Sequence, residues 1–297
     1  MRALTKSSAK GYAAAGGAFL LWGLVPLYWK QLADISALEL MLHRIVWSVV
    51  LLIFLIKLRG RMRDFLNAFS TLGSLGINFL AGSLLSANWL IYIWAVNADR
   101  IIDTSLGYFL VPFVSTALGL FVLNERLNRA QIVAMVFALI GVMIQVIHVG
   151  RIPWVGLGLA GTFGLYGLLR KRSTLGSLTG LGVETTLIAP VALGMLIYLH
   201  QGGNGSLGQV DLLSHILIIG TAVVTTVPLL LFSVGARLIP LSRIGLMQFI
   251  TPFCTLFLGL LIYDEPLPPA RLISFIIIWI GLMIYLIDLH RDRRRNS

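Results

Sequence analysis

Three ionisable side chains lie inside long apolar runs of this chain, where they could recognise charge or carry protons. His43 and Arg44 are adjacent in one such run, and Glu184 lies in another. If these runs cross a bilayer, an arginine costs at least about 2.5 kcal/mol and must face the protein interior or water. Arg44 is then expected to attract an anionic or carboxylate group, and His43 to titrate or form hydrogen bonds. Glu184 is expected to carry a proton or to pair with a basic group. The alternatives are an arginine that snorkels outward or binds helix-end carbonyls, and an interfacial glutamate.

A second set of candidates combines an amide with aromatic rings. Asn88 and Tyr92 are spaced i and i+4, so they share one face of a helix, with Trp89 next to that face. An amide beside aromatic rings suits a pocket for a planar or amphipathic solute. The alternative is a belt of aromatic residues at the membrane surface, which fits Trp94 in particular.

Two further polar residues stand at corresponding places before prolines. Tyr108 precedes Pro112, and Gln248 precedes Pro252, in each case by four residues. We therefore expect Tyr108 and Gln248 to belong to a central binding site, with Tyr166 as a weaker member. Proline removes a backbone hydrogen bond and bends a helix, so Pro112 and Pro252 are expected to act as hinges or to shape a cavity. The alternative is two static kinks.

The elements that must position these residues are membrane-spanning helices. The chain has 297 residues, of which 58% are apolar and only 12% charged, with a mean hydropathy of +0.90. A spanning helix needs about 20 mostly apolar residues. On that basis the sequence predicts an all-α polytopic membrane protein with ten spans, at residues 10–29, 37–57, 73–98, 101–123, 129–148, 153–170, 178–199, 212–235, 240–262 and 269–289. The sixth is the weakest, being short, rich in glycine and followed by basic residues.

The basic residues sort sharply between the two sides of such an arrangement. Eighteen Lys and Arg residues fall on the side of the termini, including 170–172, and four on the other: Lys30, Arg100, Arg151 and Arg271. The positive-inside rule then places both termini in the cytoplasm. The same rule accounts for the net charge of +11 without a nucleic-acid partner. The only partners expected are a small-molecule solute and the lipid bilayer, with monomer and dimer both open.

Two stretches 140 residues apart repeat one another. Residues 109–144 and 249–284 align without a gap and share 13 of 36 residues, among them a proline, two glycines and a glutamate. An offset of five spans reverses the direction of the second copy, so the halves 1–151 and 152–297, the latter with a basic tail, are predicted to be an inverted repeat. Inverted repeats are typical of transporters, in which two similar halves rock about a central site.

No motif indicates catalysis, a metal or a cofactor. The chain lacks a phosphate-binding G-x-x-x-x-G-K-[ST] loop, an H-E-x-x-H motif and a G-x-S-x-G motif. Its single cysteine, Cys254, excludes disulfides and cysteine-based metal sites within the chain. We therefore expect no catalytic residues, no metal site and no cofactor.

The same residues resemble a known family. The ten-span repeat is similar to the drug/metabolite transporter superfamily and its EamA-type domains, and several strings resemble the RarD branch. These strings are 43–48, 88–90 with 93–97, 105–109, 184–185, 224–230 and 248–250. The resemblance implies a secondary exporter in a bacterial inner membrane, with helices around a central cavity. It also associates the branch with chloramphenicol.

Together these observations predict a secondary-active transporter that exports small amphipathic metabolites or chloramphenicol-type drugs by alternating access, with coupling to protons left open. Asn88, Trp89, Tyr108 and Gln248 would contact the solute, and the three ionisable residues would set charge selectivity or coupling. One rival is an uncoupled facilitator or channel, which would be indifferent to the proton gradient. A second is an intramembrane enzyme acting on a lipid carrier, and a third is a structural membrane subunit.

Overall fold

The computed structural model describes residues 6–98, 101–150, 152–203, 205–263 and 268–294, and the regular structure in these ranges is helical. The helices are α1 (Lys6–Trp29), α2 (Ala37–Leu58), α3 (Met62–Ala68), α4 (Leu72–Asn97), α5 (Ile101–Leu123), α6 (Arg129–Val149), α7 (Trp154–Arg172), α8 (Ser177–Gln201), α9 (Leu212–Leu238), α10 (Leu241–Gln248), α11 (Ile250–Leu261) and α12 (Pro269–Arg294), with a short 3-10 turn η1 at Lys30–Leu32. Residue 151, at the predicted boundary between the halves, lies outside these ranges.

The predicted all-α polytopic class is confirmed. Within the described ranges, nine helical segments are long and apolar enough to cross a membrane, and α10 and α11 together form one of them. Large apolar side chains are exposed along these segments, for example Phe54, Phe121 and Ile147. In a bilayer they would face lipid. The glycine-rich α7 is not among the nine and carries three basic residues in its last turn. The count of ten spans therefore stays a prediction.

Helix ends follow local chemistry. Ser36 caps α2, where its hydroxyl accepts a hydrogen bond from the Glu39 amide at 3.2 Å. Asn128 and Gln131 form a reciprocal capping box at the start of α6. Gly150 ends the same helix with φ of 70°, in the left-handed region that glycine enters at little cost.

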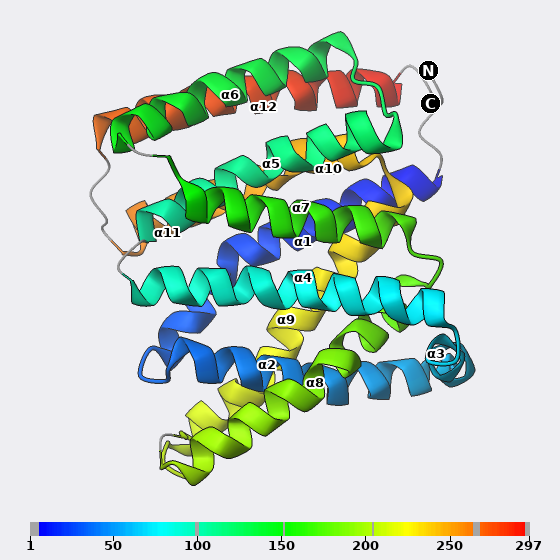
Figure 1. Cartoon of the computed structure of the whole chain (residues 1–297). Coiled ribbons are helices and arrows are strands. Elements are labelled where there is room, and N and C mark those ends of the chain that lie inside the picture. The colour runs from blue at the N-terminus through cyan, green and yellow to red at the C-terminus, as the bar shows by residue number, and fades with distance from the viewer. Residues whose placement is uncertain (1–5, 99–100, 151, 204, 264–267, 295–297) are drawn as a thin grey trace.

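The helices form one bundle with two ends. The first turn of α1 and the last turn of α12 lie at the same end, which we name the terminal end; the opposite one is the far end (Figure 1). The small helix α3 also lies at the terminal end (Figure 1). The turn between α1 and α2, the loop between α8 and α9, and the end of α11 lie at the far end (Figure 1).

The most extensive packing joins helices from the two halves of the chain. α6 packs on α12, α2 on α8, and α5 on α10. Three further pairs of extensive contacts between the halves are exchanged: α5 on α7 with α1 on α11, α1 on α9 with α4 on α7, and α2 on α9 with α4 on α8. In each of these pairs the second contact is made by the equivalent helices of the opposite halves, so both halves contribute to the interior.

Repeated glycines permit this close packing. A Cβ added to Gly141 of α6 would lie 2.7 Å from the Ser274 carbonyl oxygen on α12, and one added to Gly281 of α12 would lie 2.8 Å from the Ala134 carbonyl oxygen on α6. Real side chains do not approach so closely. The two repeat-related glycines therefore serve the same contact from opposite sides.

The two copies of the proline segment differ in one respect. Pro112 lies inside the continuous helix α5. The equivalent helix of the second half breaks at Phe249, three residues before Pro252, into α10 and α11. The break makes Gln248 the last residue of α10.

Candidate functional site

A large cavity of about 770 Å³ lies between the helices of the bundle. Its walls come from both halves: α1, α2, α4 and α5 on one side, and α7, α9, α10, α11 and α12 on the other. This volume falls in the range of small-molecule sites. Its described lining is largely aromatic and aliphatic, with Arg44 and Arg271 as the charged members.

The cavity reaches the far end. Its lining includes Leu32, Ser36 and Tyr263, which lie in or next to the far-end turns, whereas no described residue of the terminal-end loops lines it. Tyr92 and Tyr108 lie well inside their helices yet are 38% and 48% exposed. Since both line the cavity, part of this accessible surface faces the cavity.

The fold brings most of the predicted residues together. Asn88, Trp89, Tyr92, Tyr108 and Gln248 all line this cavity. So do Arg44 and Pro252. Pro112, His43, Glu184 and Tyr166 are not part of its lining.

Arg44 projects from α2 onto a tryptophan. Its Cζ lies 3.5 Å from the ring centroid of Trp89, a cation–π contact that fixes the guanidinium plane. Its Nε is buried and has no hydrogen-bond partner among the described residues. Arg44 also forms no ion pair with a described carboxylate. The ring of Trp89 thus positions the Arg44 guanidinium, while no described carboxylate pairs with its charge.

The neighbouring His43 faces the other way. Its Nε2 lies 3.6 Å from Oε1 of Glu39, and both side chains are buried. Glu39 in turn accepts hydrogen bonds from the Ser206 amide at 2.6 Å and from its hydroxyl at 2.7 Å. This contact ties α2 to the far-end loop before α9.

Asn88 has a structural task besides lining the cavity. Its Nδ2 donates to the Leu159 carbonyl oxygen and to the Thr162 hydroxyl, both at 2.9 Å. These bonds join α4 to α7 across the halves. The amide donors predicted to meet a solute are therefore already engaged.

Gln248, in contrast to Asn88, has a side-chain amide without hydrogen-bond partners among the described residues. Its side chain is 4% exposed, and neither Nε2 nor Oε1 has a hydrogen-bond partner among the described residues. An unpaired buried amide is costly, and a polar solute group or a water would satisfy it. Nearby in the lining, the rings of Tyr92 and Tyr108 meet edge to face at 6.4 Å.

Glu184 belongs to a buried cluster on the terminal side of the cavity. Its Oε1 accepts from Nη1 of Arg170 at 2.7 Å, and the side chains of these two residues are 1% and 0% exposed. The same arginine donates to the Ser233 hydroxyl through Nε and Nη2. Tyr166, which is fully buried, stacks on Phe232 with its hydroxyl beside the Glu184 carboxylate.

Arg170 is an unpredicted member of this cluster. Its position groups it with the basic residues at the end of α7, but the structure buries it completely. A clue was present in the sequence: a glutamate inside an apolar run needs a basic partner.

Glu125 is a second residue that was not predicted, and it joins the two halves at the terminal end. Glu125, in the loop after α5, accepts hydrogen bonds from the amides of Leu241 and Ser242 at 2.8 Å and from the Ser242 hydroxyl at 2.7 Å. Its carboxylate thus caps the N-terminus of α10, where the helix dipole favours negative charge. Lys171 lies 3.7 Å from the same carboxylate.

Metal binding finds no support in the described residues, where no group of three or more His, Cys, Asp or Glu side chains is placed to hold an ion.

Comparison with known proteins identifies relatives over nearly the whole chain. The EamA-like transporter family model matches residues 9–147 and 152–287. An uncharacterized transporter of Bacillus subtilis, YojE, is 41% identical over 93% of each chain. Protein RarD of Streptomyces exfoliatus is 39% identical over 94% of this chain and 89% of its own. A solved crystal structure superposes with a TM-score of 0.71 at 14% identity, covering 93% of this chain and 96% of that one; this likeness concerns the fold alone.

Proposed function

Because the chain belongs to the EamA-like transporter family, we propose that this membrane transporter is a secondary carrier that moves small amphipathic solutes by alternating access. The observation that carries the proposal is the cavity of about 770 Å³, walled by both halves and reaching only one end of the bundle. A carrier needs such a space, accessible from one side at a time.

The opposite end supports the same proposal. Glu125 and the start of α10 join the two halves at the terminal end, and the Arg170–Glu184 pair lies buried on the same side of the cavity. With both termini in the cytoplasm, this conformation is the outward-facing one. Release of the terminal-end contacts and closure of the far end would then give the inward-facing one.

We assign solute contact to Trp89, Tyr92, Tyr108 and Gln248, with Asn88 as a positioning residue that holds α4 on α7. Pro112 and Pro252 would be hinges of the rocking motion, supported by the helix break beside Pro252. Tyr166, which lies outside the lining, would act through the Glu184 cluster rather than by touching the solute.

The proposal also includes a direction of transport, which is export, and coupling to protons. The direction follows from the resemblance to the RarD branch, with chloramphenicol-type drugs among the candidate solutes. Glu184 and His43 are the candidate coupling groups, each buried beside a partner of opposite charge type. The bacterial inner membrane is the proposed location.

An uncoupled facilitator is the second candidate function, because neither coupling candidate lines the solute cavity. The two functions differ in what a proton gradient does. A coupled carrier concentrates its solute, whereas a facilitator only equilibrates it.

Sealed liposomes carrying the purified protein provide the test. Uptake and efflux of a mixed panel of metabolites and drugs would be followed with and without an imposed pH gradient. Saturable movement that the gradient concentrates supports the coupled carrier. Saturable movement that the gradient never concentrates supports the facilitator. No movement beyond empty liposomes for any panel solute would contradict both.

A further inference from the structure

The charge of the cavity lining is one-sided. Among the described lining residues, Arg44 and Arg271 carry positive charge, and none is acidic. Neither arginine forms an ion pair with a described carboxylate. Arg44 is partly buried, with its Nε covered, and a guanidinium in such a position is stabilised by a counter-charge. No described carboxylate supplies one, so an anionic group of the solute would fill this role.

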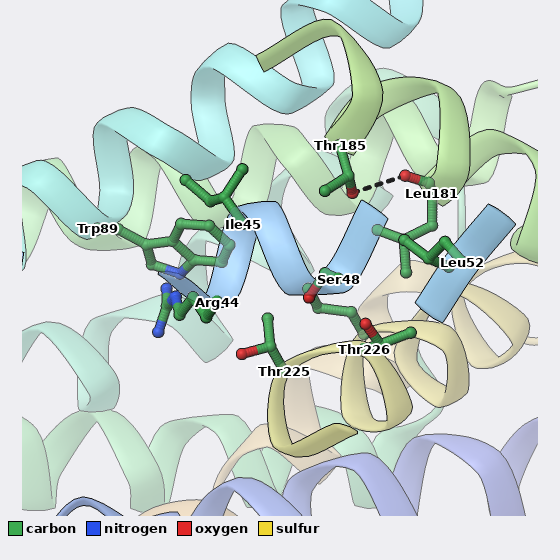
Figure 2. Close-up of a pocket in the computed structure, with 10 residues that line it drawn as sticks. Arg44, Ile45, Ser48, Leu52, Trp89, Leu181, Thr185, Thr225 and Thr226 are labelled. Carbon is green, nitrogen blue, oxygen red and sulfur yellow. Dashed lines mark hydrogen bonds between the residues drawn. The ribbon is translucent and has the colours of Figure 1, made fainter. Parts of the chain in front are cut away.

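A small side pocket opens beside this arginine. Its volume is about 10 Å³, and Arg44, Trp89, Thr225 and Leu229 line both it and the main cavity. Figure 2 shows the pocket where α2, α4, α8 and α9 meet, with Thr225 turned toward Arg44. A space of roughly 10–15 Å³ holds a single water-sized atom. The pocket therefore has room for a group about the size of one oxygen atom.

Unpaired hydroxyls surround this pocket. Ser48, one turn after Arg44 on α2, and Thr225 and Thr226 of α9 are buried, and none of the three hydroxyls has a partner among the described residues. Threonines in helices often bond back to their own carbonyls, as Thr185 does to Leu181 at 2.7 Å in the same pocket (Figure 2). Thr225 and Thr226 do not. Their hydroxyls remain available to donate.

We propose that Arg44, with the hydroxyls of Thr225 and Ser48, binds the carboxylate of an amphipathic organic acid, whose apolar part occupies the aromatic cavity. One carboxylate oxygen would meet the guanidinium and the other the side pocket. A phosphate ester fits less well, because its three terminal oxygens exceed what a one-oxygen pocket receives. The apolar part would lie against Trp22, Phe163 and Trp89, which line the main cavity.

The inference rests on the proposed function and narrows it to a solute class. It ranks organic acids above neutral amides and above amines of the same shape. An amine would place a second positive charge beside Arg44 with no acidic lining residue to offset it.

The test uses three probes with the same ring and different charge: 1-naphthylacetate, 1-naphthylacetamide and 2-(1-naphthyl)ethylamine. Their binding to the full-length protein in lipid nanodiscs is measured by calorimetry at neutral pH. We expect the acid to bind at least roughly tenfold more tightly than the amide. A hydrogen bond to a charged group contributes enough free energy for a difference of that size. The amine is expected to bind most weakly.

Variants show which residues cause the preference for the acid. Arg44→Gln should weaken acid binding by roughly 10- to 100-fold and leave amide binding within about threefold. Arg63→Gln, an exposed arginine on α3, is the matched control and should keep the acid preference. Thr225→Val keeps the side-chain shape and should weaken the acid by about three- to tenfold. Should Arg44→Gln fail to fold, Arg44→Lys and Thr225→Val carry the test.

Several outcomes overturn the inference. They are equal binding of acid and amide, binding of none of the probes, and an acid preference that survives both Arg44→Gln and Thr225→Val. Liposome transport separates this failure from failure of the carrier. Saturable transport without an acid preference leaves the carrier and removes the anion site. Acid binding through Arg44 without transport of any panel solute would support the anion site and contradict the carrier.

Discussion

Arg170 of α7 and Glu184 of α8 form an ion pair at 2.7 Å in the interior, where neither side chain meets solvent. The guanidinium also binds Ser233 of α9, so three helices of the second half meet at one charge. Gly180 makes room for it, because a Cβ there would lie 2.3 Å from the arginine Nη1. The pair is therefore built into the packing of the second half.

Removal of one partner should destabilise the protein strongly. Glu184→Gln leaves the Arg170 charge buried and uncompensated, at a typical cost of about 3–5 kcal/mol. We expect a clear fall in the thermal unfolding midpoint of the purified protein. Asp64→Asn is the matched control, since Asp64 and Arg61 form an exposed pair at 2.9 Å with side chains 50% and 65% exposed; such pairs contribute about 0–1 kcal/mol. Equal midpoints for the two variants would contradict the structural role.

The Glu125 cap should hold the terminal end closed. Glu125→Ala removes three hydrogen bonds to the start of α10, and each charge-assisted bond is worth about 1.5–3 kcal/mol. Thr116 is buried beside this contact and donates to the Ser242 carbonyl oxygen at 3.3 Å. A cysteine at position 116 therefore becomes accessible to a reagent only when the contact opens. With Cys254 replaced by Ala and Thr116 by Cys, we expect maleimide labelling to accelerate at least roughly tenfold in Glu125→Ala. An unchanged labelling rate would show that the cap does not control access.

The crossing of α5 and α10 should tolerate no added methyl group. A Cβ on Gly245 would lie 2.6 Å from the Pro112 carbonyl oxygen, so Gly245→Ala has to push the helices apart. Overpacking of this kind costs about 1–3 kcal/mol. The same change at Gly194 of α8 meets nothing within 4 Å and should be neutral or slightly stabilising through helix propensity. Thermal unfolding of the two alanine variants compares them directly, and a stable Gly245→Ala protein would argue against a close crossing.

The hydrogen bonds of Asn88 should matter more for architecture than for solute contact. Asn88→Ala removes the bonds to Leu159 and Thr162, with an expected loss of about 1–2 kcal/mol in stability. Thr162→Val removes one of the two contacts and should cost about half as much. Tyr108→Phe is the contrast, because Tyr108 is half exposed in the cavity and should affect solute affinity with little change in stability. Solute binding weakened by Asn88→Ala at unchanged stability would instead make Asn88 a direct contact.

The sequence by itself determined the elements and the kind of protein. Long apolar runs specify helices in a bilayer because backbone groups there must bond within their own segment. The ends of the long helices agree with the predicted spans within about five residues, whereas the short helix α3 and the break at Phe249 were not predicted. Local signals set several boundaries, such as Ser36 before α2 and Gly150 after α6. The repeated prolines and glycines and the family resemblance pointed to a transporter, and the membership of the EamA-like family agrees.

Only the tertiary structure decided which polar residues act together. Hydropathy and spacing are local, whereas the contacts that matter join residues far apart: Glu125 caps a helix 116 residues later, and Asn88 binds Leu159 across 71. The sequence therefore grouped His43 with Arg44 and treated Arg170 as a loop residue. In the fold, adjacent positions on α2 face different neighbours, and Arg170 in the last turn of α7 is covered by α8 and α9. Helices that are distant in the sequence bury some polar residues and leave others facing the cavity. No local pattern in the sequence records this burial, so only the fold shows which residues line the cavity and which hold the bundle together.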